Sequence, residues 1–255
     1  MSRKAFIRQE ALVEYLNEHT ELSVEDLCTY FKVSEATIRR DLAELEELKK
    51  VKRIIGGVQV LPSAAPEPPI ESRMGEVSYE KEIIGVAAAK LIQDGDTVFI
   101  SSGSTAYQTA RNITKHERLT VITNSLPVID LISKCPKITL IALGGILRQS
   151  EQSFVGPGAE QALQGLRADK AILGVRAIHL EQGLTNDALP ETQIDRLVIN
   201  IASEVIVVSD HTKFDKIAPL FLAPLQSISK IVTDDIEDIK ALAYKEQGIQ
   251  IIRAI

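Results

Sequence analysis

Residues 34–42 read Ser34-Glu35-Ala36-Thr37-Ile38-Arg39-Arg40-Asp41-Leu42, and this stretch decides the fold of the first part of the chain. Ile38 and Leu42, with Leu45 just beyond, recur at helical spacing and predict the buried stripe of an amphipathic helix. Ser34 precedes the stripe, where a serine side chain can cap a helix by accepting a backbone N–H. The stretch therefore predicts a helix that begins at about residue 35.

The outward face of this helix carries residues suited to DNA. At about 100° per residue, Ala36 and Arg40 point away from the stripe, while Thr37 and Arg39 lie on its flanks. An outward guanidinium at a helix N-terminus can reach guanine or phosphate, and a small neighbour allows close approach to the groove. We therefore interpret the segment as a DNA recognition helix.

Two further amphipathic segments precede it. Ser23 is placed to cap the second, and only Lys32-Val33-Ser34 separates the second from the third, a connection typical of a helix-turn-helix. The apolar positions are Ile7, Leu12, Tyr15 and Leu16 in the first segment, and Val24, Leu27, Cys28 and Phe31 in the second.

A β-hairpin is predicted after the third helix. The run 51–60 consists of two β-rich stretches around Gly56-Gly57, and it carries the basic residues Lys52 and Arg53. Residues 1–60 thus predict a winged helix-turn-helix. The alternative is a small structural or interaction domain, since Arg40 and Glu44 could form an ordinary i,i+4 surface pair.

The charge distribution agrees with a site-specific binder. The net charge is −6, and residues 1–60 hold ten Lys+Arg against eleven Asp+Glu. Within this part, the basic residues gather on the recognition helix and just beyond it, at Arg39, Arg40, Lys49, Lys50, Lys52 and Arg53. Such a local patch favours specific recognition over binding through bulk charge.

Composition changes after residue 60. The segment 61–75 begins with a run rich in proline, which predicts an extended, semi-rigid linker. Residues 76–255 then alternate apolar strands with helices, the pattern of a largely parallel sheet covered on both faces. The whole chain is therefore predicted as an α/β protein: a winged helix-turn-helix followed by a Rossmann-like second domain.

Small polar residues follow three of the predicted strands, where ligands bind in such sheets. Because the first of these runs opens a helix, its hydroxyl and backbone N–H groups can converge on an anion. Three such turns in succession predict a shared pocket for a phosphorylated sugar. The runs contain Ser102, Gly103, Ser104 and Thr105, then Asn124 and Ser125, then Gly144 and Gly145.

The chain resembles the DeoR family of bacterial sugar-catabolism regulators over nearly its whole length. Residues 34–42 are similar to the family signature, and Arg53 with Gly56-Gly57 resembles the family's wing, although Ile55 stands where the family usually has histidine. The second domain resembles the DeoR sensor domain, which is similar in fold to ribose-phosphate isomerases and binds phosphorylated sugars. The resemblance implies that the loop 102–105 holds the phosphate, that Asn124 lies near the sugar, and that the matching segments around Lys170 and Lys213 belong to the site.

Three further positions, all in the second domain, depart from the family pattern. Ser101 and Arg176 replace aspartates, and Asp195 replaces a lysine, so an acid and a base have exchanged signs. An arginine cannot act as the proton-transfer base that an isomerase needs. We consider that Arg176 and Asp195 form a reversed ion pair in the pocket, or that Arg176 reaches an extra acidic group of the effector; the alternative is that Arg176 points to solvent.

The function that we favour is a transcriptional regulator, in particular a repressor released from operator DNA by a phosphorylated sugar. The alternatives are an isomerase-like enzyme with an accessory DNA-binding domain, and a transcriptional activator. We expect a homo-oligomer on repeated half-sites, a cytoplasmic location, no membrane span, and neither a metal nor a cofactor. Cys28 and Cys135 are expected to be reduced core thiols.

Overall fold

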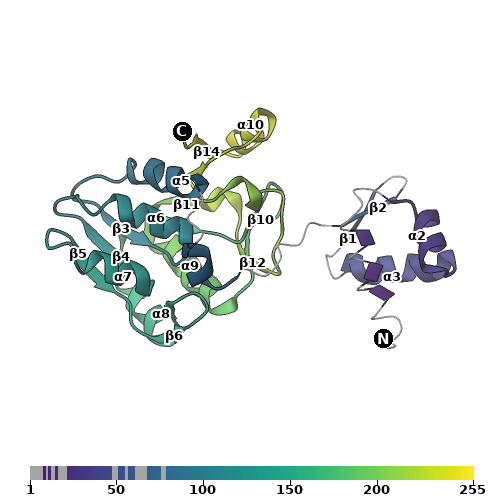
Figure 1. The fold of residues 1–255 in the computed structure, drawn as a ribbon, viewed down its shortest axis with the longest axis horizontal. Coiled ribbons are helices and arrows are strands. Elements are labelled where there is room, and N and C mark those ends of the chain that lie inside the picture. The colour runs from purple at the N-terminus through teal and green to yellow at the C-terminus, as the bar shows by residue number, and fades with distance from the viewer. Residues whose placement is uncertain are drawn as a thin grey trace. The chain divides into compact units, whose positions relative to one another are not determined.

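The computed structural model describes residues 8–9, 11–12, 15–16, 22–47, 51–54, 57–60, 68–75 and 79–255. The chain divides into two compact units, unit 1 (residues 1–64) and unit 2 (residues 65–255) (Figure 1). No helix in the described part of the chain combines the length and the apolar character that crossing a membrane requires.

Unit 1 contains helical residues at 8–9, 11–12 and 15–16, followed by two helices and a hairpin, as predicted. Ser23 caps the helix Val24–Phe31 through a reciprocal capping box with Asp26. Leu12, Leu27 and Val58 are among the residues of its small core. The elements are α2 (Val24–Phe31), α3 (Glu35–Glu47), β1 (Val51–Ile54) and β2 (Gly57–Val60).

Unit 2 is built on a seven-stranded parallel sheet in the order β14-β13-β11-β8-β3-β4-β5. All seven strands come from residues 76–255, where a largely parallel sheet of apolar strands was predicted, and this confirms the Rossmann-like interpretation of the sequence. The strands are β3 (Thr97–Ile100), β4 (Thr120–Thr123), β5 (Thr139–Ala142), β8 (Ala168–Gly174), β11 (Ala202–Val208), β13 (Lys230–Thr233) and β14 (Gln250–Arg253).

Helices cover both faces of this sheet. Successive side chains of each strand point to opposite faces, and both faces carry apolar side chains that pack against helices. Val98 and Ile100 pack in the core formed with α5, α6 and α7, whereas Phe99 packs in the core formed with α8, α9 and α10. The helices are α5 (Tyr79–Ala89), α6 (Ser104–Asn112), α7 (Leu126–Ile132), α8 (Pro157–Gln164), α9 (Leu189–Ile201) and α10 (Asp238–Glu246).

Five short strands of unit 2 are absent from the sequence prediction. β6 (Ile146–Arg148) and β7 (Ser153–Val155) form an antiparallel hairpin, and β12 (Leu220–Ala223), β10 (Gly183–Asn186) and β9 (Ala177–His179) form a small sheet in that order. Short helical turns lie at His211–Lys213 and Leu225–Ser227.

The segment 61–75, predicted as linker, contains a helix at its end. α4 (Ile70–Gly75) buries Ile70, and the backbone N–H of Ile70 donates to the carbonyl of Ser150 at 2.8 Å. α4 is therefore packed on unit 2, beside the β6–β7 hairpin. Residues 61–67 lie outside the described part of the chain.

Candidate functional site

The recognition helix α3 has the two faces that its sequence predicts. Ile38, Leu42 and Leu45 are buried, whereas Ala36 and Arg40 are exposed. The periodicity of the apolar residues thus separates a core-facing stripe from a face that is open to a ligand.

Ser34 starts this helix in a way that differs from the prediction. Its carbonyl accepts hydrogen bonds from the backbone N–H groups of Thr37 (2.9 Å) and Ile38 (3.1 Å). Its hydroxyl, however, lies 2.9 Å from the hydroxyl of Thr37. Ser34 therefore starts α3 through its carbonyl, while its side chain bonds to Thr37.

The two arginines of α3 differ in their surroundings. Arg39 forms an exposed i,i+4 ion pair with Glu35, with Nη2 2.6 Å from Oε1. Arg40 is exposed and has no hydrogen bond or ion pair to any residue in the described part of the chain. Glu44, its predicted partner, instead accepts a hydrogen bond from Gln9 at 2.7 Å. Arg40 is therefore available to an external acceptor.

Asp41 has a structural role that the sequence interpretation missed. Its buried carboxylate accepts from Nε of Arg8 at 2.5 Å and from Nη2 of Arg8 at 3.1 Å. Gln9 donates to the same carboxylate at 3.3 Å. Asp41 thus ties α3 to the helical residues 8–9 and helps to set the orientation of the recognition helix.

The wing is present as an antiparallel pair in which Val51 lies opposite Val60 and Ile54 opposite Gly57. Lys52 and Arg53 lie on β1, but their side chains are outside the described part of the chain, as are Lys49, Lys50, Ile55 and Gly56. DNA contacts by the wing therefore remain a prediction.

Unit 2 contains a cavity of about 270 Å³. Because it is lined by residues that follow β3, β8 and β11, it lies at the carboxyl ends of the central strands, as expected for such a sheet. The cavity brings together seven of the residues predicted for the effector, namely Ser102, Gly103, Ser104, Thr105, Arg176, Asp195 and Lys213.

The loop 102–105 presents the start of α6 to this cavity. Gly103 adopts φ 122°, and no side chain caps the helix. Ser101 is buried, and its hydroxyl accepts a hydrogen bond from the N–H of Gly174 at 3.0 Å, which joins the ends of β3 and β8. The loop is thus held by the sheet, while the helix N-terminus offers N–H groups and a favourable dipole to an anion.

Arg176 and Asp195 do not form the predicted ion pair. Nε of Arg176 lies 3.3 Å from a carboxylate oxygen of Asp187, and the Arg176 side chain is only 10% exposed. Asp195 instead accepts from the amide of Asn186 at 3.0 Å. Arg176 lines the cavity, so the alternative in which it points to solvent is also wrong.

Asp195 has an unusual ionisation equilibrium. Burial raises its pKa to about 7, an effect that the hydrogen bond from Asn186 opposes and the neighbouring charge of Glu191 reinforces. The side chain is therefore poised between its neutral and charged forms near neutral pH. In its neutral form it can donate a hydrogen bond as well as accept one.

Two of the polar residues predicted for the effector are not part of the cavity lining. Asn124 and Ser125 are buried and do not line the cavity. The amide of Asn124 donates to the carbonyl of Phe154 at 3.1 Å, and Ser125 pairs with Ser153 in an isolated β-bridge. Both residues bind the end of β4 to the β6–β7 hairpin.

Gly144, Gly145 and Lys170 also lie outside the cavity lining. Gly145 has φ +144°, and a Cβ at this position would lie 2.6 Å from the carbonyl oxygen of Val155, so glycine is needed for packing. Lys170 pairs with Asp96 at 2.6 Å, where Asp96 precedes β3. Lys170 therefore belongs to the amino end of the sheet, opposite the cavity.

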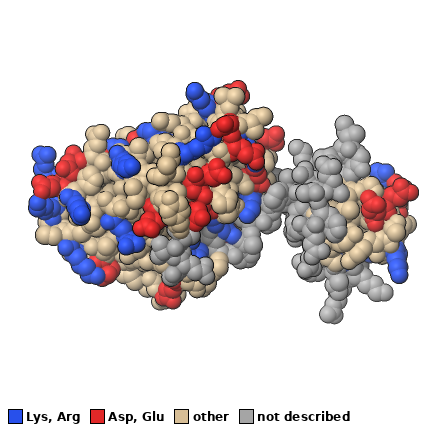
Figure 2. Space-filling model, turned by 45° about the horizontal axis from the view of Figure 1, so that its top comes forward, with Lys and Arg blue, Asp and Glu red and all other residues tan. Residues whose placement is uncertain are grey.

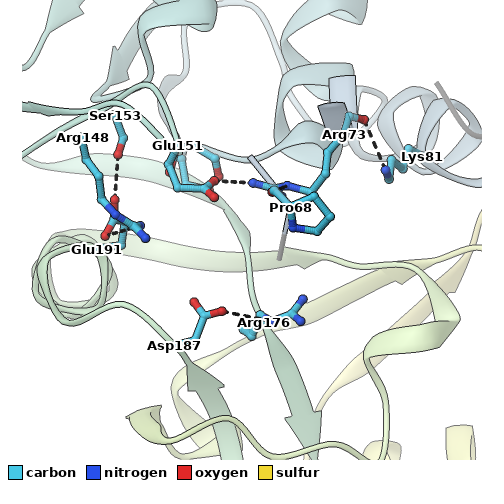
Figure 3. Close-up of polar contacts among 11 residues, drawn as sticks. Pro68, Arg73, Lys81, Arg148, Glu151, Ser153, Arg176, Asp187 and Glu191 are labelled. Atoms are coloured by element: carbon cyan, nitrogen blue, oxygen red, sulfur yellow. Dashed lines mark hydrogen bonds and ion pairs between the residues drawn. The ribbon is translucent and has the colours of Figure 1, made fainter. Parts of the chain in front are cut away.

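The cavity also has charged residues that the sequence interpretation missed. Arg148 pairs with Glu191 at 2.8 Å, and Arg73 pairs with Glu151 (Figure 3). Glu191 also accepts from the hydroxyl of Ser153 at 2.9 Å. Arg148 lies on β6 and Glu151 in the turn that follows it. Because this short hairpin was not predicted, no sequence pattern placed the two residues near the loop 102–105.

Lys213 reaches the cavity from the turn that follows β11. Asp210 caps this turn by accepting from the N–H of Thr212 at 3.0 Å. Asp234 accepts from both the N–H (2.7 Å) and Nδ1 (2.6 Å) of His211. The hydrogen bond to the Asp234 carboxylate raises the pKa of His211, which favours the protonated form of the ring.

Elsewhere on unit 2, charges of both signs are interspersed over the face seen in Figure 2. Cys28 and Cys135, predicted as core thiols, are free and half-buried, and each packs against a core cluster.

Comparisons with known proteins agree with this architecture. Residues 8–64 match the DeoR-like helix-turn-helix domain, and residues 76–235 match the DeoR C-terminal sensor domain. The transcriptional repressor AccR of Agrobacterium fabrum is 33% identical over 228 residues, covering 89% of this chain and 88% of AccR. The transcriptional repressor GlcR of Bacillus subtilis is 33% identical over 230 residues, covering 89% of this chain and 87% of GlcR.

Among solved structures, ribose 5-phosphate isomerase from Plasmodium falciparum is 20% identical, with a TM-score of 0.40 over 52% of each chain.

Proposed function

This chain belongs to the DeoR family of transcriptional regulators, and we propose that it is a repressor whose operator affinity falls when a phosphorylated sugar binds in the cavity of unit 2. The protein is a DNA-binding regulator and not an enzyme. Two relatives named as transcriptional repressors support the direction of regulation.

In unit 1, we assign base recognition to Arg40. Its guanidinium is exposed on α3 and has no partner in the described part of the chain, so it can make the bidentate contact that guanine accepts. Arg39, which is held by Glu35, is assigned to the DNA backbone, with Ser34, Ala36 and Thr37 beside it. Lys52, Arg53, Gly56 and Gly57 are assigned to the wing contact.

In unit 2, the observation that carries the effector proposal is the uncapped start of α6 at Ser102–Thr105, which faces a cavity that also receives Lys213 and Arg176. Backbone N–H groups, hydroxyls and cations together fit a phosphate. Asp187 and Asp195 also line the cavity, and their carboxyl oxygens are possible acceptors for sugar hydroxyls.

Induction requires a difference in affinity between two arrangements of the protein. The sugar phosphate must bind the arrangement with low operator affinity more tightly, because equal affinity for both would shift nothing. A single winged helix reads only a few base pairs, so we propose that two or more copies bind repeated half-sites.

A thermal-shift screen of the full chain against phosphorylated sugars tests the effector proposal. A compound that binds only the folded protein must raise its melting temperature. Arg176→Ala should reduce the shift, while Lys170→Ala should keep it, because Lys170 lies at the opposite end of the sheet. The proposal fails if no phosphorylated sugar shifts the wild-type protein, or if Arg176→Ala and Lys170→Ala behave alike.

Transcription of the target operon tests the direction of regulation. Loss of the protein should raise transcription of a promoter whose operator it occupies. Lower transcription after its loss would make the protein an activator.

A further inference from the structure

α4 connects the effector cavity to the chain that leads to unit 1. Besides the bond from Ile70 to Ser150, Glu71 accepts from the side chain of Gln152 at 2.7 Å. These contacts hold α4 against the turn between β6 and β7. The sequence interpretation placed α4 in the linker, yet its contacts make it a wall of unit 2.

Arg73 is the residue of α4 that reaches the cavity. Its Nη2 pairs with the carboxylate of Glu151, and both side chains are largely buried, at 13% and 16% exposed (Figure 3). Its Nε donates to the carbonyl of Pro68 at 2.9 Å. One guanidinium therefore lines the cavity, pairs with the turn between β6 and β7, and bonds to Pro68, which precedes α4 within the predicted linker.

An anionic ligand would change the balance of these contacts. A phosphate or carboxylate in the cavity is a competing acceptor for the Arg73 guanidinium, and it repels the carboxylate of Glu151. Because Arg73 also donates to Pro68, a shift of its side chain moves a hydrogen bond to the linker backbone. The arrangement links ligand binding to the linker without a long chain of intermediates.

We propose that Arg73 is a ligand-binding residue of the cavity. When an anion binds, Arg73 exchanges its partner Glu151 for the anion, and this exchange alters the hydrogen bond of Arg73 to the linker backbone at Pro68. This inference rests on the proposed function, since it names how the same site regulates DNA binding. It predicts that the Arg73–Glu151 pair maintains the arrangement with high operator affinity.

The experiment uses the full chain and a DNA duplex selected by the wild-type protein from a random library. Operator affinity is measured for wild type, Arg73→Gln, Glu151→Gln and the charge-exchanged double variant Arg73→Glu with Glu151→Arg. The matched control is Arg253→Gln. Arg253 lies on the edge strand β14 and pairs with Asp238 of α10. Melting temperatures establish that each variant is folded.

Without any ligand, each single variant should bind the duplex about tenfold more weakly than wild type, within the usual range of allosteric coupling. The double variant should recover most of the loss, a pairwise effect that a general loss of stability would not produce. Arg253→Gln should bind as wild type does. Wild-type affinity in both single variants, or no recovery in the folded double variant, overturns the inference.

The second arm adds glucose 6-phosphate, fructose 6-phosphate or inorganic phosphate. A compound that raises the wild-type melting temperature should weaken wild-type operator binding, and Arg73→Gln should lose most of this response. A response in Arg73→Gln equal to that of wild type overturns the inference. If no phosphorylated sugar shifts the wild-type melting temperature, the proposed function fails and the exchange of partners at Arg73 fails with it, while the ligand-free arm still decides whether the Arg73–Glu151 pair maintains operator affinity.

Discussion

The buried carboxylate of Asp195 accepts a hydrogen bond from the side-chain amide of Asn186 at 3.0 Å. The carbonyl of the same amide accepts from the backbone N–H of Arg176 at 3.1 Å. Asn186 thereby fixes two residues of the cavity, one through its side chain and one through its backbone. The hydrogen bond from the neutral amide stabilises the charged carboxylate by less than burial destabilises it, so the pKa of Asp195 rises to about 7.

Asp195→Asn should therefore stabilise the protein above neutral pH. The pKa of Asp195 in the folded state lies above the ordinary value of 3.8, so Asp195 binds its proton more tightly in the folded than in the unfolded wild type. The wild type therefore loses stability as pH rises from about 4 to about 7. The gain of Asp195→Asn should be largest at pH 8, at most about 4 kcal/mol, and should vanish near pH 4. Urea unfolding at both pH values measures it.

Asp130→Asn is the control for that measurement, because Asp130 is an exposed partner of Lys134 and should give little change at either pH. A gain for Asp195→Asn that is the same at pH 4 and pH 8 would show that its pKa is not raised.

Arg40→Ala should lower operator affinity by about 1–3 kcal/mol and relax the preference at one base pair. The reason is that Arg40 is exposed on α3 without an ion pair in the described residues. Binding to the operator and to singly substituted operators measures both effects. Arg39→Ala is the comparison, and it should weaken binding on all of these sequences alike. Equal losses on all sequences for Arg40→Ala would make it a phosphate contact.

Asp41→Ala should destabilise unit 1 without affecting unit 2. It leaves the side chains of Arg8 and Gln9 without their buried acceptor, at an expected cost of about 1–3 kcal/mol. Thermal unfolding and operator binding should both reveal the loss, while the thermal shift by a sugar phosphate persists. Glu25→Ala, an exposed change on α2, should be neutral. Full operator affinity in Asp41→Ala at elevated temperature would contradict this role.

Gly145→Ala should destabilise unit 2 by about 1–3 kcal/mol, because its φ of +144° and the nearby Val155 carbonyl leave no room for a Cβ. Gly144→Ala, with open space around its Cβ, should change stability by less than about 0.5 kcal/mol. Chemical unfolding of the matched pair tests this. If Gly145→Ala is stable but binds no sugar phosphate, Gly145 is a ligand contact after all.

The recognition helix and the parallel sheet were predictable because local periodicity carries their signal. Ile38, Leu42 and Leu45 mark one face of α3 whatever surrounds it, and the apolar runs of β3 and β11 are too continuous for solvent-exposed strands. The start of α6 was predictable for the same reason, since Ser102–Thr105 directly follows such a strand.

The short strands were not predictable in this way. β6, β7 and β9 have three residues each, too few for an alternating pattern to stand out. Consequently Arg148 and Glu151 had no predicted position, and Arg73 was assigned to the linker. Their meeting in the cavity depends on how the hairpin packs beside α4.

The sequence by itself determined the class of the protein: the helix-turn-helix, the outward arginines and the order of strands and helices follow from residue spacing along the chain. Only the tertiary structure decided which charges share the cavity. Lys170 lies near the start of β8 and Arg176 follows its end, and the extended segment 170–174 alone spans roughly 13 Å at about 3.3 Å per residue. Asp195 accepts from Asn186 rather than Arg176 because partner choice depends on side-chain position in space, which spacing along the chain does not specify.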